Sequence, residues 1–158
     1  MRVIGRAMDV NRLQQTYSNH FLSLFDEGIL NQQFKELRLL QDDNNPTFLF
    51  EIVSLFTESA GTSINEIRSY CNQPATDFIK IKALLFRLKG SSQSLGAQNV
   101  EIACENLRNG CDEYDLQNFL SCMEQLNLEF LKFKTKLETL FKLEQQIVAA
   151  GGSIPNIQ

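Results

Sequence analysis

Residues that could act as nucleophiles, acid–base groups or metal ligands are sparse in this chain of 158 residues. His20 is the single histidine, and the four cysteines form no Cys-x-x-Cys pair. A zinc site therefore lacks ligands at a useful spacing, and one distant histidine cannot complete a Ser-His-Asp or Cys-His arrangement. We expect no enzyme activity, no cofactor and no metal site. The cysteines are interpreted as buried free thiols of a reducing compartment: Cys71, Cys104, Cys111 and Cys122.

One segment combines a helical apolar pattern with residues that disfavour a helix. Residues 83–97 read ALLFRLKGSSQSLGA, and Gly90 is followed directly by Ser91 and Ser92. Glycine and serine are both poorer helix formers than alanine, so their presence suggests that something must approach the backbone closely. The serines could be kinase targets, but we interpret them as small residues that allow close packing.

A helical wheel places Phe86 away from the buried face of this segment. At about 100° per residue, Phe86 falls roughly 140° from the centre of the apolar face. The pattern predicts a largely exposed aromatic side chain within a basic and polar ridge. Single exposed apolar residues are common, so the wheel alone assigns no function. The neighbours of Phe86 on this ridge are Lys82, Lys89, Gly90 and Gln93.

The elements that position this ridge are all expected to be helices. Apolar periodicity predicts two short helices between Val10 and Leu40, separated at Gly28. It then predicts four longer helices over residues 46–71, 77–95, 98–110 and 115–149. The expected caps are Asn45 before Pro46, Asp77 and Asp115. The predicted fold is all-α, an antiparallel four-helix bundle with additional short N-terminal helices. A single domain covers residues 1–158, with a mobile tail from about residue 151.

Composition narrows the range of partners. The net charge of -4 argues against nucleic acid as the main partner, because phosphate binding needs a basic surface. No stretch approaches the roughly 20 apolar residues that span a bilayer, and the N-terminus lacks the apolar core of a signal peptide. We therefore expect no membrane partner and a location in the cytoplasm and nucleus.

Several separate motifs resemble those of plant histidine-containing phosphotransfer proteins. The run from Leu88 to Ala97 is similar to the family's active-site motif, approximately HQLKGSSxSxGA. Residues 41–46, QDDNNP, resemble its LQDxxNP turn, and residues 136–146 resemble its closing helix. The matches occur in the same order over most of the chain, so the resemblance implies the family's helical fold.

The sequence differs from the family's motif at the residues that carry out phosphotransfer. The phosphoryl-accepting histidine aligns with Phe86, the following glutamine aligns with Arg87, and Leu84 replaces a second histidine that active members often have. Phosphotransfer needs an imidazole nitrogen to attack an aspartyl phosphate, and a phenyl ring has no such lone pair. The resemblance therefore implies a protein that binds phosphorelay partners without carrying the phosphoryl group.

The implied partners are receiver domains of hybrid histidine kinases and response regulators, and the chain is expected to be a monomer. A negative regulator of cytokinin-type signalling is the leading hypothesis. The implied docking residues on the ridge are Lys82, Phe86, Arg87, Lys89, Gly90 and Gln93. A second part of the docking surface is implied around the short helices, at Phe25, Gly28, Ile29 and Phe34, although these apolar residues could equally belong to the core.

Two alternatives stay open from the sequence. A helical bundle that kept only its fold could act as an adaptor for an unrelated protein, in which case Lys89, Gly90 and Gln93 would not matter for binding. An active carrier could instead use His20, although this residue lacks a lysine and a glycine one turn further on.

Overall fold

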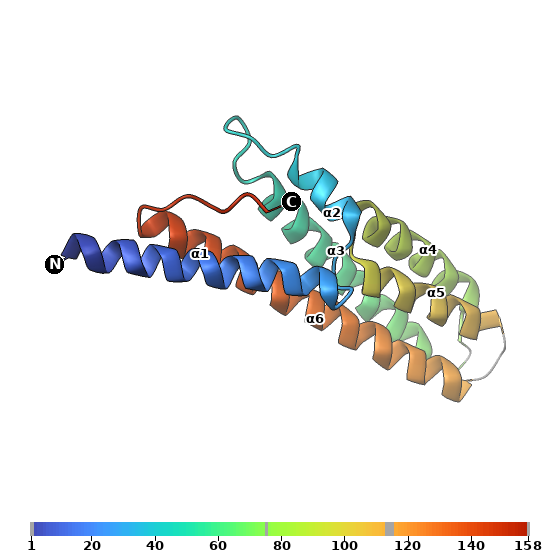
Figure 1. Ribbon diagram of the computed structural model, residues 1–158. Coiled ribbons are helices and arrows are strands. Elements are labelled where there is room, and N and C mark those ends of the chain that lie inside the picture. The colour runs from blue at the N-terminus through green and yellow to red at the C-terminus, as the bar shows by residue number, and fades with distance from the viewer. Residues whose placement is uncertain (1, 75, 113–115, 158) are drawn as a thin grey trace.

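The computed structural model describes residues 2–74, 76–112 and 116–157, and every regular element among them is a helix (Figure 1). Helices α3–α6 form a bundle in which α3 and α5 each contact both α4 and α6. Helix α1 lies along α6, and α2 packs on α4. The all-α bundle predicted from the sequence is confirmed. The helices are α1 (Arg2–Asp26), α2 (Gln32–Arg38), α3 (Phe48–Cys71), α4 (Phe78–Leu95), α5 (Gln98–Asp112) and α6 (Leu116–Ala149).

Aromatic side chains pack the bundle interior. Phe56 of α3 meets Phe133 of α6 edge to face, with 5.3 Å between the ring centroids. Phe130 of α6 packs on α3 beside Gly61, where a Cβ atom would make an ordinary contact with its ring at 3.7 Å. Burying each such side chain stabilises the fold by about 1.5–3 kcal/mol relative to leaving it exposed. The seam between α3 and α6 therefore contributes to the stability of the bundle.

The N-terminal helix is longer than the sequence pattern suggests. The two helices that we predicted between Val10 and Leu40 are present as α1 and α2, but α1 begins already at Arg2 and is 25 residues long. Tyr17, Phe21 and Leu24 are buried, and contact with α6 stabilises a helix whose own apolar pattern is short. The predicted break at Gly28 is confirmed, since this residue adopts a φ of 72°.

Capping residues end the helices close to the predicted positions. The side chain of Asp77 accepts a hydrogen bond from the backbone N–H of Lys80, and Gly96 ends α4 with a φ of 81°. Helix α3 begins at Phe48, two residues later than predicted, because Asn45 and Pro46 belong to the preceding turn. The predicted cap Asp115 lies outside the described residues.

The tail after α6 has a defined place, although its glycine pair led us to expect a mobile segment. Arg38 donates hydrogen bonds to the carbonyl oxygens of Pro155 at 2.7 Å and Ile157 at 3.4 Å. Gln14 donates to the carbonyl oxygen of Ser153 at 2.8 Å. Ile154 and Ile157 also pack against the core. These contacts hold the tail against α1 and α2, on the side where Figure 1 shows it turning back from α6.

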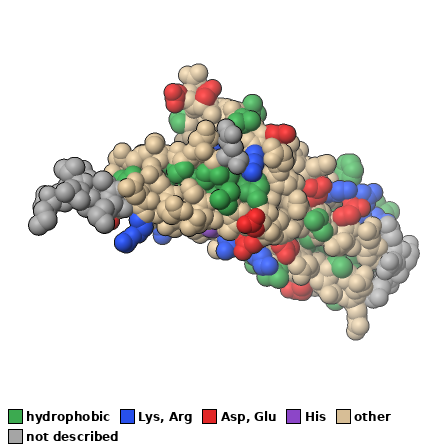
Figure 2. Space-filling view, in the orientation of Figure 1, with side chains coloured by type: hydrophobic (Ala, Val, Ile, Leu, Met, Phe, Trp, Pro, Cys, Tyr) green, Lys and Arg blue, Asp and Glu red, His purple; other side chains and the backbone are tan. Residues whose placement is uncertain are grey.

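Charged side chains of both signs are interspersed on the face shown in Figure 2, with apolar side chains between them. No helix in the described ranges combines the length and the apolar character that a bilayer-spanning segment needs. The net charge of the whole chain is -4. The molecule therefore offers a surface of mixed charge on this face.

Candidate functional site

The ridge predicted from the helical wheel exists on α4. Ser92 lies in the middle of the buried face of α4 and donates a hydrogen bond to the carbonyl oxygen of Leu88. A buried serine is therefore accommodated without an unsatisfied hydroxyl group. The buried residues of α4 are Ile81, Leu84, Leu85, Leu88, Ser92 and Leu95.

Phe86 projects from the opposite side, with 68% of its surface exposed. Arg87, Gly90 and Gln93 are also exposed, whereas Lys82 and Lys89 are half-buried. Apart from its chain neighbours and the backbone of its own helix, no atom lies within 4 Å of the position that a Cβ atom on Gly90 would occupy. An aromatic ring thus stands beside an open patch of backbone on the protein surface.

Lys89 has an ionic partner that the sequence analysis missed. Its Nζ atom lies 2.8 Å from Oε2 of Glu105, on the neighbouring helix α5. The hydrogen bond and the charge of Lys89 lower the pKa of the Glu105 carboxyl below its ordinary value. The signal that could have revealed this pair is the hairpin geometry of α4 and α5. The two residues lie at similar distances along the chain from the turn at Gly96 and Ala97.

The turn between α1 and α2 is attached to the end of α4. The carbonyl oxygen of Gly28 accepts a hydrogen bond from the backbone N–H of Asn99, and that of Gly96 accepts one from Asn31. Gly96 is required here because a Cβ atom would lie 2.6 Å from the backbone nitrogen of Phe34. The structure therefore brings Gly28 close to the turn that follows the ridge.

Two of the predicted docking residues belong to the core. Ile29 is 4% exposed and Phe34 is fully buried, so neither side chain can contact a partner in the folded state. This corrects the docking assignment for these two residues, because the hydrophobic effect places them beneath α2 and the α1–α2 turn. Phe25 is half-buried, and the ammonium group of Lys35 lies 4.6 Å from its ring centre.

His20 connects two helices and lies far from the ridge in the sequence. Its Nε2 atom lies 2.9 Å from the carbonyl oxygen of Lys136, which makes this nitrogen the hydrogen-bond donor between α1 and α6. A nitrogen that donates to a carbonyl group has no free lone pair for nucleophilic attack. This contact weighs against His20 as a phosphoryl acceptor.

The cysteines offer no reactive centre in the described structure. Cys104 is buried, and burial raises the pKa of its thiol to about 12. Cys71 and Cys122 are half-buried free thiols, so the prediction of burial is confirmed fully only for Cys104. The side chain of Cys111 lies outside the part that is described. Within the described residues, no group of three or more histidine, cysteine, aspartate or glutamate side chains could hold a metal ion.

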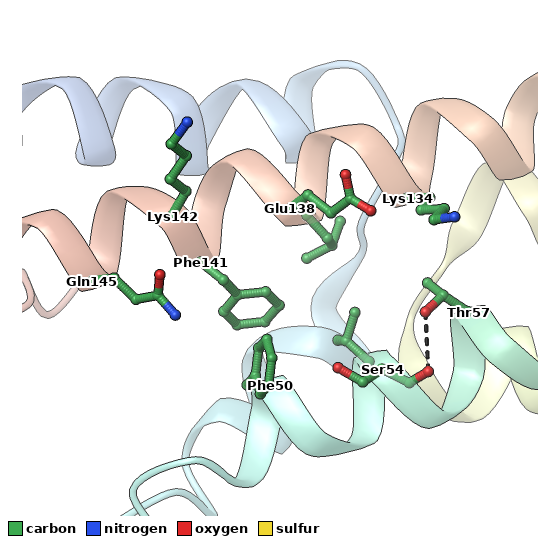
Figure 3. Close-up of a pocket in the computed structure, with 10 residues that line it drawn as sticks. Phe50, Ser54, Thr57, Lys134, Glu138, Phe141, Lys142 and Gln145 are labelled. Carbon is green, nitrogen blue, oxygen red and sulfur yellow. Dashed lines mark hydrogen bonds between the residues drawn. The ribbon is translucent and has the colours of Figure 1, made fainter.

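A separate groove of about 490 Å³ runs between α3 and α6. The rings of Phe50 and Phe141 meet edge to face across it, with 5.4 Å between their centroids (Figure 3). Lys134 and Lys142 lie along its α6 side, on either side of Glu138. The groove contains none of the predicted docking residues, so the α4 ridge is the candidate site that sequence and structure share.

Comparisons with known proteins agree with the motif resemblance. A scan against protein-family models finds no match. The chain is 41% identical over 151 residues to histidine-containing phosphotransfer protein 1 of Arabidopsis thaliana, covering 96% of this chain and 98% of the relative. It is 30% identical over 146 residues to pseudo histidine-containing phosphotransfer protein 6 of the same plant, covering 92% of this chain and 95% of the relative.

Solved structures show the same relationship. A histidine-containing phosphotransfer protein from Medicago truncatula superposes with a TM-score of 0.84 at 35% identity, covering 89% of this chain and 96% of that one. A histidine-containing phosphotransfer protein from maize superposes with a TM-score of 0.81 at 34% identity, covering 85% of this chain and 99% of that one. The fold is therefore that of a phosphotransfer helical bundle. The chain belongs to the histidine-containing phosphotransfer protein family.

Proposed function

We propose that this chain is a pseudo-phosphotransfer protein, which binds receiver domains of a multistep phosphorelay but accepts no phosphoryl group. The observation that carries the proposal is the exposed Phe86 on α4, in the motif position where the family's histidine stands. The following residues still read LKGSS, as in the family motif. The nucleophile is thus replaced, together with the neighbours at Leu84 and Arg87, while the run from Leu88 to Ser92 is kept.

The chemistry at residue 86 supports the loss of phosphotransfer. A nucleophile must supply a lone pair to the phosphorus atom of an aspartyl phosphate, and a phenyl ring supplies none. The only histidine of the chain, His20, uses its Nε2 atom to join α1 to α6. No second imidazole is available to replace the missing group.

The surface around Phe86 supports continued binding. Phe86, Gly90 and Gln93 are exposed together, and Gly90 leaves the backbone open to a close approach. Covering a phenyl side chain by a partner contributes about 1.5–3 kcal/mol, which corresponds to roughly ten- to a hundredfold in affinity. Phe86 therefore adds apolar contact area at the position where the reacting histidine would have stood.

The biological role follows from binding without transfer. A monomer that occupies receiver domains of hybrid histidine kinases and response regulators competes with active carriers in the cytoplasm and nucleus. Such competition lowers the flow of phosphoryl groups and dampens cytokinin-type signalling. The chain would then act as a negative regulator and not as an enzyme.

A calorimetric titration with a purified receiver domain of a hybrid histidine kinase tests the proposal. We expect micromolar binding that weakens in Lys89→Ala and is unchanged in Lys132→Ala. Lys132 is a matched control, because it is a lysine of α6 that also lies near a carboxylate, 3.8 Å from Glu129. An absence of binding to several receivers would instead favour an adaptor that kept only the fold.

A further inference from the structure

The ion pair between Lys89 and Glu105 connects the ridge of α4 to α5. We propose that Glu105 is a positioning residue that holds Lys89 and thereby limits the affinity of the ridge for receiver domains. This inference rests on the proposed function, because it concerns the regulation of the same docking surface.

Glu105 is close enough to hold the ammonium group of Lys89 in place. The Nζ and Oε2 atoms are 2.8 Å apart, which is a close ion-pair contact. The side chains of Lys89 and Glu105 are 31% and 41% exposed, so the pair lies at the surface where a partner could reach it. Because Glu105 belongs to α5, the contact holds the ammonium group of Lys89 against α5.

The charge of the expected partner makes this contact relevant to binding. The partner expected from the proposed function carries an aspartate that becomes phosphorylated, so its docking site holds at least one negative charge. A free lysine is attracted to an acidic pocket of this kind, whereas a lysine neutralised by a carboxylate is attracted much less. Docking must therefore either break the pair or proceed without the full charge of Lys89.

Removing the carboxylate charge should strengthen binding. Exposed ion pairs are weak, and their loss corresponds to an affinity change of about two- to fivefold. We expect Glu105→Gln to tighten receiver binding by this factor in a calorimetric titration at about 0.1 M salt. The gain should shrink as the salt concentration rises, because screening weakens the attraction between the freed lysine and the receiver.

A double-mutant cycle separates the effect of Lys89 from the simple removal of a negative charge. In a Lys89→Ala background, Glu105→Gln should change the affinity by less than about 1.5-fold, because no lysine is left to release. Glu101→Gln is the matched control, since it removes one negative charge from the same helix one turn earlier. This control should also leave the affinity nearly unchanged.

The ion pair can be tested independently of any partner. In Lys89→Ala, the pKa of Glu105 measured by NMR titration should rise toward its ordinary value, because its hydrogen-bond donor is gone. Equal tightening with and without Lys89, or no tightening at all, would overturn the inference while leaving receiver binding intact. If the unmodified protein bound no receiver, the proposed function itself would fall, and this inference with it.

Discussion

Gly90→Ala should change stability and receiver binding in opposite directions. Gly90 lies in the interior of α4, and apart from its chain neighbours and the backbone of its own helix, no atom lies within 4 Å of the position that the new methyl group would take. Alanine is a better helix former than glycine by about 0.5–1 kcal/mol, so the folded state should gain roughly this amount. For a domain of this size, the melting temperature should rise by about 1–4 °C.

The same methyl group should hinder docking. If the receiver approaches the backbone at Gly90, an added methyl group overpacks the interface at a cost of about 1–3 kcal/mol. Receiver affinity should therefore fall by about fivefold to a hundredfold in a calorimetric titration. The thermal melt and the titration are measured on the same preparation, so a folding defect cannot be mistaken for a binding defect.

Gly61→Ala provides a matched control on α3. A Cβ atom at Gly61 would lie 3.7 Å from the ring of Phe130, which is an ordinary contact, and the residue is likewise inside a helix. This variant should gain stability in a similar way while binding the receiver as the unmodified protein does. Unchanged receiver affinity in Gly90→Ala would refute the idea that a partner covers Gly90. A lower melting temperature would refute the helix-propensity reasoning.

Two further predictions concern the missing nucleophile and a buried carboxyl group. Phe86→His should accept a phosphoryl group from a phosphorylated receiver, because Lys89 and Gly90 are still present. The transfer would be detected as acid-labile label on the variant. A folded but unlabelled variant would mean that neighbours such as Arg87 have also disabled the site. Burial raises the pKa of Glu144 from 4.5 to about 7, with Arg38 opposing the rise. The Glu144 carboxyl therefore loses its proton at a lower pH in the unfolded chain than in the folded chain. As the pH rises from 4.5 through 7, this difference should lower the free energy of unfolding by up to about 3 kcal/mol. Denaturant titrations at several pH values should show this decrease, and Glu144→Gln should lack it; identical pH profiles would contradict the assignment.

Much of the fold follows from patterns that are local in the sequence. The residues that end α4, Asp77 and Gly96, act through their own backbone and side-chain geometry, so their types alone indicated the helix boundaries. The exposure of Phe86 also follows from the periodicity of a single helix. These features need no knowledge of how distant segments pack.

The features that sequence analysis missed depend on contacts between distant segments. The length of α1 reflects its packing on α6, and the place of the tail depends on Arg38, more than 100 residues earlier in the chain. The burial of Ile29 and Phe34 likewise depends on how α2 lies against α4. The partner of Lys89 could be found only once α4 and α5 were paired. Helical periodicity describes which face of a helix is apolar, but not which neighbour covers it.

A phosphotransfer assay with an active carrier tests the central claim most directly. Labelled phosphoryl groups would pass from one receiver domain through a histidine-containing carrier to a second receiver, with increasing amounts of this chain added. We expect transfer to slow as the chain is added, with no label appearing on the chain itself. Acid-labile label on this chain would contradict the loss of phosphotransfer, and an unchanged transfer rate at saturating concentrations would contradict competitive binding to receivers.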